Sequence, residues 1–160
     1  MFYIADTETT DRNGTQCVWL WALISEDGTE KIGNNINSLM HCILSVPRAK
    51  REKITIFFHN LKFDGSFIVN WLLSNDYKHE LKAEKSKTFE VFIDDRGTWY
   101  SITINHKGKK YHIWDSYKKI PLSVEDIGKT YGKISKGEID QTKPRPNGYE
   151  PTGEEIEYNL

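Results

Sequence analysis

Three acidic residues in two distant segments have the residue types and spacing of metal ligands. Asp6 and Glu8 lie two positions apart at the end of an apolar run that is typical of a strand. Because residues i and i+2 of a strand share one face, both carboxylates can reach the same hard cation. Asp64 follows a second apolar run, Ile54 to Phe58. The carboxyl ends of neighbouring strands converge in a parallel or mixed sheet, so we expect the three carboxylates to meet.

Such a cluster of carboxylates is unfavourable unless cations neutralise it. It matches the arrangement for two-metal cleavage of phosphodiesters, in which ions roughly 3.5 to 4 Å apart stabilise the attacking and leaving oxygens. The first pair is weak support by itself, because the same acid-x-acid spacing recurs elsewhere, as at Glu155/Glu157. The alternative interpretation of the first pair is an exposed strand end.

The elements that position these acids can be predicted from apolar periodicity and turn residues. A hairpin is expected to join strands at Phe2 to Ala5 and Val18 to Ile24, because Asn13-Gly14 between them suits a tight turn. Helical spacing after the run at 54–58 places Asp64 at a strand-to-helix junction. The other expected elements are a strand at 30–32, a helix at 37–46, three strands at 89–93, 99–105 and 110–115, a helix at 123–130, a loop at 143–148 and a helix that Thr152 caps with help from Glu155.

Composition predicts a single globular domain in a reducing compartment. The chain has 160 residues, 38% of them hydrophobic and 12% aromatic, which is enough for a packed core. We assign all five tryptophans to that core. Cys17 and Cys42 have no CxxC spacing that would indicate a zinc site. With no run approaching the 18 apolar residues of a membrane span, we expect a cytoplasmic protein without a membrane partner.

Overall charge does not mark the chain as a nucleic-acid-binding protein. It has 22 basic and 23 acidic residues, for a net charge of -1. Any nucleic-acid surface must therefore be local, and each candidate segment taken alone is more often a solvated face. The candidate basic segments are Lys85/Lys87, Lys107 to Lys110, Lys118/Lys119 and Lys133 to Arg145.

Four segments extend the pattern beyond the three acids: Asp6 to Thr9, Phe58 to Gly65, Trp114 to Pro121 and Lys136 to Asp140. Together, and in this order, they resemble the exonuclease domain of the protein-primed family B DNA polymerases of bacteriophages. Asp6 to Thr9 is similar to a motif that supplies two metal ligands. Phe58 to Gly65 is similar to a motif whose Asp binds metal and whose Asn and Phe hold a single-stranded 3′ end. The resemblance implies an α/β fold of the ribonuclease H-like kind, a mixed β-sheet flanked by helices.

The resemblance also implies roles for individual residues. Asp6 would bridge two Mg²⁺ or Mn²⁺ ions, while Glu8 and Asp64 would complete one ion site each. Lys136 would assist catalysis near the scissile phosphate. The third motif of the family is Tyr-x-x-x-Asp on a helix; Tyr158 fits its Tyr, and its Asp would fall beyond Leu160. The residues expected to contact DNA are Thr9, His59, Asn60, Phe63, Phe67, Ser116 and Tyr117.

The function implied is proofreading: 3′→5′ hydrolysis of single-stranded DNA by one exonuclease domain, residues 1–160, that is cut within the third motif. The expected partners are a DNA 3′ end, a polymerase domain in the same or a longer chain, and terminal protein, all in the host cytoplasm if a phage encodes the chain. From the resemblance we expect no DNA synthesis by this chain alone. One alternative is a non-catalytic module that binds single-stranded DNA or a protein partner. Another is a compact nuclease that completes its site with Glu154, Glu155 or Glu157.

Overall fold

A computed structural model describes residues 1–47, 53–132 and 139–159. Its centre is an eight-stranded mixed sheet with the order β3-β2-β1-β4-β8-β7-β6-β5. The pairs β1/β4, β4/β8 and β5/β6 are parallel, and the others are antiparallel. The strands are β1 Phe2–Arg12, β2 Thr15–Ser25, β3 Glu30–Gly33, β4 Ile54–Phe58, β5 Lys78–His79, β6 Thr88–Ile93, β7 Trp99–His106 and β8 Lys109–Asp115.

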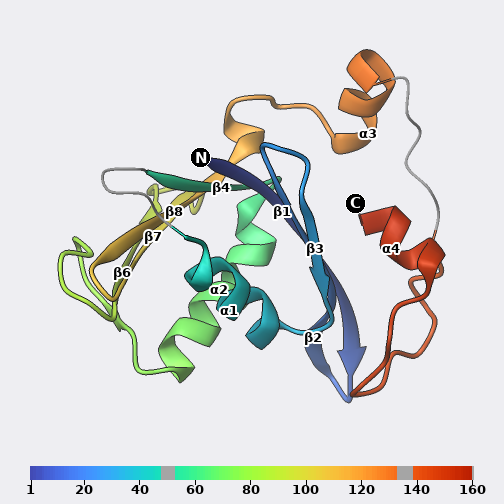
Figure 1. Cartoon of the computed structure of the whole chain (residues 1–160), viewed down its shortest axis with the longest axis horizontal. Coiled ribbons are helices and arrows are strands. Elements are labelled where there is room, and N and C mark those ends of the chain that lie inside the picture. The colour runs from blue at the N-terminus through green and yellow to red at the C-terminus, as the bar shows by residue number, and fades with distance from the viewer. Residues whose placement is uncertain (48–52, 133–138, 160) are drawn as a thin grey trace.

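Helices cover both faces of this sheet, as Figure 1 shows, with α1 and α2 on one side of β1 and α4 on the other. Helix α1 packs on β2 and α2, while α2 packs on β7 and α4 packs on β1 and β2. The expected ribonuclease H-like architecture is therefore confirmed. The helices are α1 Ile36–Ser45, α2 Leu61–Ser74, α3 Val124–Ile127 and α4 Gly153–Asn159, with a 3-10 turn η1 at Ser116–Lys118 and a π-helical turn η2 at Gly128–Gly132.

The first hairpin is much longer than the sequence indicates. Strand β1 is expected to end at Ala5, but it continues to Arg12 because it pairs with β2 along its whole length. The turn lies at Asn13-Gly14, both with positive φ, which confirms the turn prediction. Parallel pairing with β4 does stop at Ala5, opposite Phe58. The distal half of β1 therefore extends past the carboxyl end of β4.

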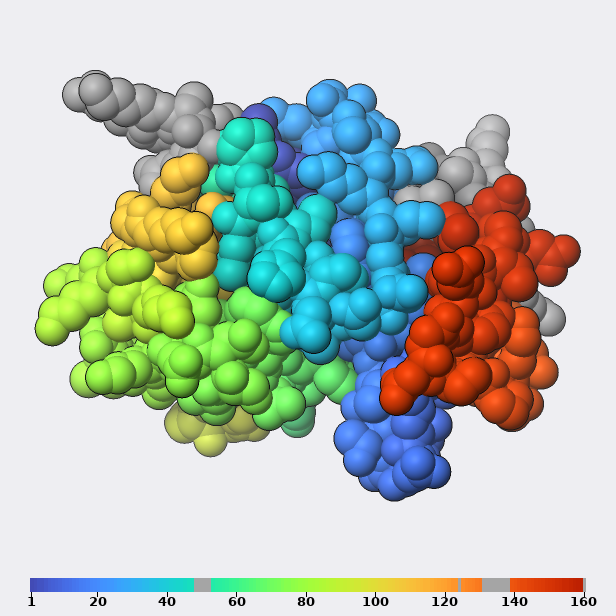
Figure 2. All heavy atoms as spheres, turned by 60° about the horizontal axis from the view of Figure 1, so that its bottom comes forward, coloured from blue at the N-terminus to red at the C-terminus, as the bar shows by residue number. Residues whose placement is uncertain are grey.

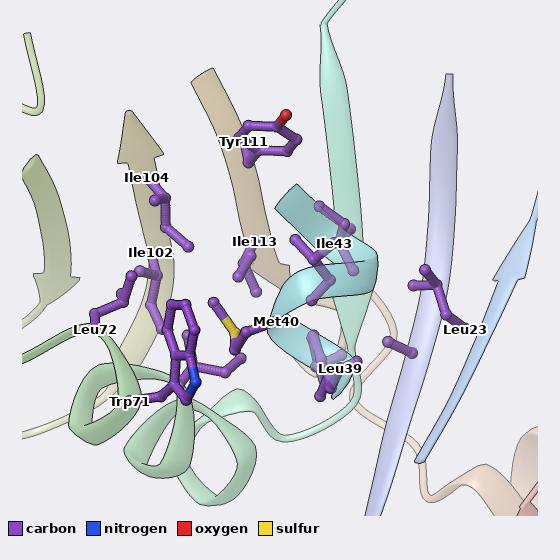
Figure 3. Packing of buried hydrophobic residues seen from close by; sticks show 14 of the residues in the cluster. Leu23, Leu39, Met40, Ile43, Trp71, Leu72, Ile102, Ile104, Tyr111 and Ile113 are labelled. Atoms are coloured by element: carbon purple, nitrogen blue, oxygen red, sulfur yellow. The ribbon is translucent and has the colours of Figure 1, made fainter. Parts of the chain in front are cut away.

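The core lies between the sheet and the pair of helices α1 and α2. Apolar side chains of the two helices point toward those of the sheet, and each fully buried one contributes about 1.5 to 3 kcal/mol. Two aromatic side chains of the sheet form hydrogen bonds with α1. Trp21 Nε1 donates to Ser38 Oγ at 2.8 Å, and Tyr111 OH donates to the Leu44 carbonyl at 2.8 Å. Figure 3 labels Leu23, Leu39, Met40, Ile43, Trp71, Leu72, Ile102, Ile104, Tyr111 and Ile113 in this layer.

The tryptophan prediction holds for most but not all of the five residues. Trp19, Trp21 and Trp71 are buried, and Trp99 packs against the core from its edge. Trp114 is only half-buried, so its assignment to the core is wrong. In the described part of the chain, no helix is both long and apolar enough to cross a membrane.

The C-terminal segment 139–159 contains a buried ion pair, and Arg145 of this pair contacts the β1–β2 hairpin. Arg145 Nη2 lies 3.0 Å from Glu155 Oε1, and the guanidinium stacks 3.9 Å from the centroid of the Trp19 ring. Arg12 in turn donates to the carbonyl of Arg145 at 2.8 Å. In Figure 2 the red C-terminal segment lies beside the blue hairpin. The predicted capping by Thr152 is confirmed: its Oγ1 accepts from the backbone N–H of Glu155 at 3.4 Å, and the Glu155 carboxylate accepts in return from the backbone N–H of Thr152 at 2.9 Å.

Candidate active site

Strand β1 carries the first acidic pair on the face of the sheet opposite α1 and α2. Along β1 the side chains of Asp6 and Glu8 are exposed and half-buried respectively, whereas Thr7 between them is buried. Trp21 pairs with Thr7 in register and contacts α1, which places Thr7 on the core side. The predicted shared face of Asp6 and Glu8 follows from this alternation.

Asp64 is held in the first turn of α2, directly after β4. The chain turns from strand to helix at Asn60, whose backbone is left-handed with φ of 64°. Gly65 lets the helix approach β7, since a Cβ at this position would lie 2.9 Å from the Trp99 ring. Asp64 is only 4% exposed, and its Oδ1 accepts a hydrogen bond of 2.5 Å from Thr7 Oγ1. The strand-to-helix junction predicted for Asp64 is present.

Burial and charge together perturb the ionisation of Asp64. The pKa of the Asp64 carboxyl is raised to about 6, mainly by burial and in smaller part by the negative charge of Glu8, while the hydrogen bond from Thr7 opposes both effects. The charge of Glu8 acts on Asp64 although the two residues are 56 positions apart in the chain. A perturbed carboxylate beside a second carboxylate is typical of functional sites.

The donor chemistry fits Mg²⁺ or Mn²⁺, because hard cations prefer carboxylate oxygens. The geometry does not gather three ligands: within residues 1–47, 53–132 and 139–159, no group of three His, Cys, Asp or Glu side chains could hold a metal ion. Asp64 bonds to Thr7 on the core side, whereas Asp6 and Glu8 project from the other face. The hydrogen bond from Thr7 brings Asp64 to the strand that carries Asp6 and Glu8, and the meeting of all three carboxylates at a metal ion stays a prediction.

Asp115 organises the neighbouring segment that is expected to contact DNA. It is buried at the end of β8, and its Oδ1 accepts 3.0 Å hydrogen bonds from the backbone N–H groups of Asn60 and Tyr117. His59 Nδ1 lies 3.1 Å from Ser116 Oγ, and the His59 ring meets the Tyr117 ring edge-on at 5.3 Å. Four of the residues expected to bind DNA are thus brought together at the carboxyl ends of β4 and β8.

The two predicted aromatic DNA contacts lie on α2. Phe63 is 48% exposed beside Asp64, and its ring meets that of Phe67 edge-on at 5.6 Å. Phe67 is only half-buried and also packs against the core, so it supports Phe63 from behind. Thr9 lies at a bulge in β1 immediately after Glu8. Phe63 is therefore the aromatic side chain placed to meet a ligand at this site.

Of the two predicted catalytic residues near the C-terminus, Tyr158 lies within the described structure and Lys136 does not. Tyr158 is half-buried on α4, which contacts β1. Lys136 lies outside the described residues, but Gln141 a few positions later has its Nε2 3.5 Å from Glu8 Oε2. The helix α4 and the segment around Gln141 thus both lie on the side of β1 that carries Glu8.

Glu155 is not available to complete a metal site. Its carboxylate is bound by the Arg145 guanidinium, by the Tyr149 hydroxyl at 2.7 Å and by the backbone N–H of Thr152. Burial opposes the ionisation of Glu155, but these hydrogen bonds outweigh it and lower the pKa to about 2. Glu155 therefore has a structural role, and of the acids proposed for a compact nuclease only Glu154 and Glu157 are exposed.

Two residues of the site are not identified by the sequence patterns. Thr7 reads only as the spacer between two acids, although its hydroxyl contacts Asp64. Asp115 lies in the segment Trp114 to Pro121, for which the resemblance implies no role of this Asp. An Asp at the end of a strand and before a turn is a typical N-cap, and Asp115 caps η1. The capping role of Asp115 can be predicted from the sequence, whereas the contact of Thr7 with Asp64 depends on tertiary structure.

Comparison with known proteins agrees with this geometry. A family model described as DNA polymerase type B, organellar and viral, matches residues 47–150. The chain belongs to the organellar and viral type B DNA polymerases. Within this family, the DNA polymerases of Bacillus phages PZA and phi29 are each 40% identical to it over 164 residues. The alignments cover 98% of this chain and 27% of each phage polymerase.

Solved polymerase structures share the fold. Phi29 DNA polymerase complexed with primer-template DNA and incoming nucleotides has a TM-score of 0.86 and 36% identity, covering 98% of this chain and 28% of that one. Phi29 DNA polymerase complexed with single-stranded DNA matches equally well. The chain spans little more than a quarter of the length of these relatives. The similarity to the exonuclease domain of protein-primed polymerases, inferred from the motifs, is thereby confirmed.

Proposed function

We propose that this domain hydrolyses the 3′-terminal phosphodiester of single-stranded DNA and releases a deoxynucleoside monophosphate. The observation that carries the proposal is the hydrogen bond from Thr7, which lies between Asp6 and Glu8, to the buried Asp64, beside an exposed aromatic residue, Phe63. Two carboxylates that repel each other, next to a stacking surface, suit a cation-dependent reaction on a nucleic-acid end.

The residues would divide the work as follows. Asp6, Glu8 and Asp64 would hold two Mg²⁺ or Mn²⁺ ions, which when bound supply charge stabilisation for the attacking and leaving oxygens. Asn60, Phe63 and the residues that follow β8 would hold the terminal nucleotides. Tyr158 would orient the attacking water through its hydroxyl. Lys136 would supply a positive charge near the phosphate.

The relatives support the biological setting of this reaction. Phi29 DNA polymerase has been solved with primer-template DNA and with single-stranded DNA, so we propose single-stranded DNA as the ligand here. We further propose that the domain proofreads for the polymerase part of the same or a longer chain during phage DNA replication in the host cytoplasm. Terminal protein, the primer of such polymerases, is a proposed partner of that assembly.

One observation favours a second function, non-catalytic binding of single-stranded DNA. In the described part of the chain the acids do not form a group that could hold a metal ion, and Asp64 is engaged by Thr7. A domain that keeps the DNA contacts without assembling the metal ligands would bind a 3′ end and leave it intact. Cleavage assays separate the two functions.

The test uses a 5′-labelled oligonucleotide with excess protein, so that single-turnover cleavage is measured with Mg²⁺ or Mn²⁺. The exonuclease proposal expects stepwise shortening from the 3′ end. The double variant Asp6→Ala/Glu8→Ala should lose this activity and keep its circular dichroism spectrum, because it removes repelling charges. The matched control, Glu154→Ala/Glu157→Ala, removes two exposed acids of α4 and should cleave normally.

Each alternative outcome has a definite meaning. Normal cleavage by Asp6→Ala/Glu8→Ala would show that the metal assignment is wrong. Loss of cleavage in Glu154→Ala/Glu157→Ala would favour the compact nuclease, which takes its third acid from α4. Binding without any cleavage by the unmodified chain would favour the binding module.

A further inference from the structure

Lysine side chains from two segments gather at one end of the sheet, where β6 begins and β7 turns into β8. The first segment, 78–87, contains β5 and leads to β6, and the second, 106–110, joins β7 to β8. All of their lysines are exposed, and we call them the lysine patch: Lys78, Lys82, Lys85, Lys87, Lys107, Lys109 and Lys110. The acids beside them are Asp76, Glu80 and Glu84, so positive charge predominates on this surface.

Hydrogen bonds hold the two segments of the lysine patch together. The backbone N–H of Lys107 donates to Ser86 Oγ at 2.9 Å, and that of Lys87 donates to the Asn105 carbonyl at 2.8 Å. The side chain of Asn105 is buried, and its Nδ2 donates to the Glu84 carbonyl at 2.9 Å. Two basic segments that are separate in the sequence thus form one surface with a fixed backbone.

The charges of the lysine patch converge on one histidine. The pKa of His106 is lowered, first by burial and then by the positive charges of Lys107, Lys87 and Lys109. His106 Nδ1 contacts the hydroxyl of the buried Tyr77, and Lys87 Nζ lies 5.8 Å from the centroid of the Tyr77 ring. Like charges held this close repel one another, and a bound anion would relieve the repulsion. Because the whole chain has a net charge of -1, a polyanion needs such a local surface in order to bind.

The composition of the lysine patch favours the sugar–phosphate backbone of double-stranded DNA. Segments 78–87 and 106–110 contain no Phe, Tyr or Trp, so they offer no aromatic platform for the bases of a single strand. Leu81 is 97% exposed, but a single aliphatic side chain is not a stacking platform. Duplex DNA carries one negative charge per about 1.7 Å of its axis, so several lysines can meet phosphates at once.

We propose that the lysine patch binds the backbone of double-stranded DNA without sequence preference. This surface is separate from the candidate active site: Lys109 is the first residue of β8 and Asp115 is the last, about 20 Å away along the strand. The proposal therefore goes beyond the hydrolysis of a 3′ end, because it concerns a part of the DNA that the active site does not hold.

The test uses duplex DNA that has no 3′ end for the active site to bind. A labelled dumbbell, which is a duplex closed at both ends, is titrated with the full chain in EDTA, and fluorescence anisotropy gives the affinity at several salt concentrations. For Lys107→Gln/Lys109→Gln we expect weaker binding and a salt slope smaller by about 1.8, the value for two duplex phosphate contacts. Lys107→Arg/Lys109→Arg should keep the slope. The matched control, Lys31→Gln/Lys129→Gln, removes two exposed charges on β3 and η2 and should bind normally.

The histidines give a second measurement on the unmodified chain. Bound DNA places negative charge beside the lysines that lower the pKa of His106, so this pKa should rise when the dumbbell is added. NMR titration of the imidazole signals measures it. His41 lies on α1, away from the lysine patch, and its titration should stay the same.

Three outcomes would overturn this inference. They are an unchanged salt slope in Lys107→Gln/Lys109→Gln, an unchanged pKa of His106 in saturating dumbbell, and failure of the unmodified chain to bind the dumbbell. If the chain instead bound vesicles that contain anionic phospholipid, the lysine patch would be a membrane-binding surface. None of these results affects the proposed hydrolysis of a 3′ end, which the cleavage assay tests separately.

Discussion

Thr7 donates a hydrogen bond from its hydroxyl to Asp64 Oδ1 at 2.5 Å, and this contact joins β1 to the first turn of α2. It is the point at which the two acidic segments of the site are connected. Both side chains are buried, so water competes little for the carboxylate. A hydrogen bond to an ionised carboxylate is among the stronger ones in proteins. Thr7 therefore helps to keep Asp64 charged in a place where burial favours its neutral form.

Replacing Thr7 with Val removes the hydroxyl and keeps the branched shape. Because the Thr7 hydrogen bond lowers the pKa of Asp64, we expect the pKa of Asp64 in Thr7→Val to rise above its value of about 6. Carboxyl ¹³C chemical shifts, followed by NMR against pH, measure it directly. Thr7→Ser keeps a donor and should titrate like the unmodified chain. Identical titrations of all three proteins would mean that the hydroxyl does not act on Asp64.

Asp64→Asn should stabilise the metal-free fold near neutral pH. The pKa of Asp64 is raised from 3.8 to about 6 in the folded chain. Its contribution to stability is therefore complete below pH 3.8, and it is lost as pH rises through about 6. A shift of this size corresponds to about 3 kcal/mol as an upper value. Urea unfolding in EDTA should show a higher free energy of unfolding for Asp64→Asn at pH 7.5 and no difference at pH 3.5. A less stable variant at pH 7.5 would contradict the prediction.

Phe63→Ala should weaken the binding of single-stranded DNA by about 1 to 3 kcal/mol, the usual loss for one stacking platform. The motivation is the exposure of this ring next to Asp64, with Phe67 supporting it. Titration of a labelled oligonucleotide in EDTA measures the effect. Leu73→Ala is a matched control, since Leu73 is 56% exposed on the same helix but lies near its other end. Equal affinities for Phe63→Ala and Leu73→Ala would assign Phe63 to packing alone.

Glu155→Gln should destabilise the fold by about 3 kcal/mol near neutral pH, because it leaves Arg145 buried without a counter-charge. The pKa of Glu155 is lowered from 4.5 to about 2, so the ion pair contributes fully above pH 4.5 and its contribution is lost as pH falls through about 2. The difference between the variant and the unmodified chain should thus shrink below pH 4. Urea midpoints from pH 2 to 7 measure it. Glu154→Gln, at an exposed neighbour, should have no such effect.

The basic outline of this protein is determined by local sequence features. Asn13-Gly14 dictates the hairpin turn, because both residues adopt positive φ at little cost. The apolar run at Ile54–Phe58 becomes β4 with the expected bounds, because a short β-branched and aromatic run followed by helical spacing has few other solutions. The alternation of side chains along β1 likewise fixes Asp6 and Glu8 on one face. These properties depend on residues that are close together in the chain.

The contacts of the site were decided by tertiary structure. Strand β1 extends to Arg12 because β2 supplies backbone partners along its length. The residues of β1 alone do not predict this pairing. Glu155 and Glu157 have the acid-x-acid spacing of metal ligands. The Glu155 carboxylate instead pairs with Arg145, which is buried against Trp19. Asp64 accepts a hydrogen bond from Thr7, a partner 57 positions away, because the packing of α2 on the sheet directs its side chain to the core face. Periodicity specifies which face a side chain occupies, whereas its partner depends on which distant segment packs there.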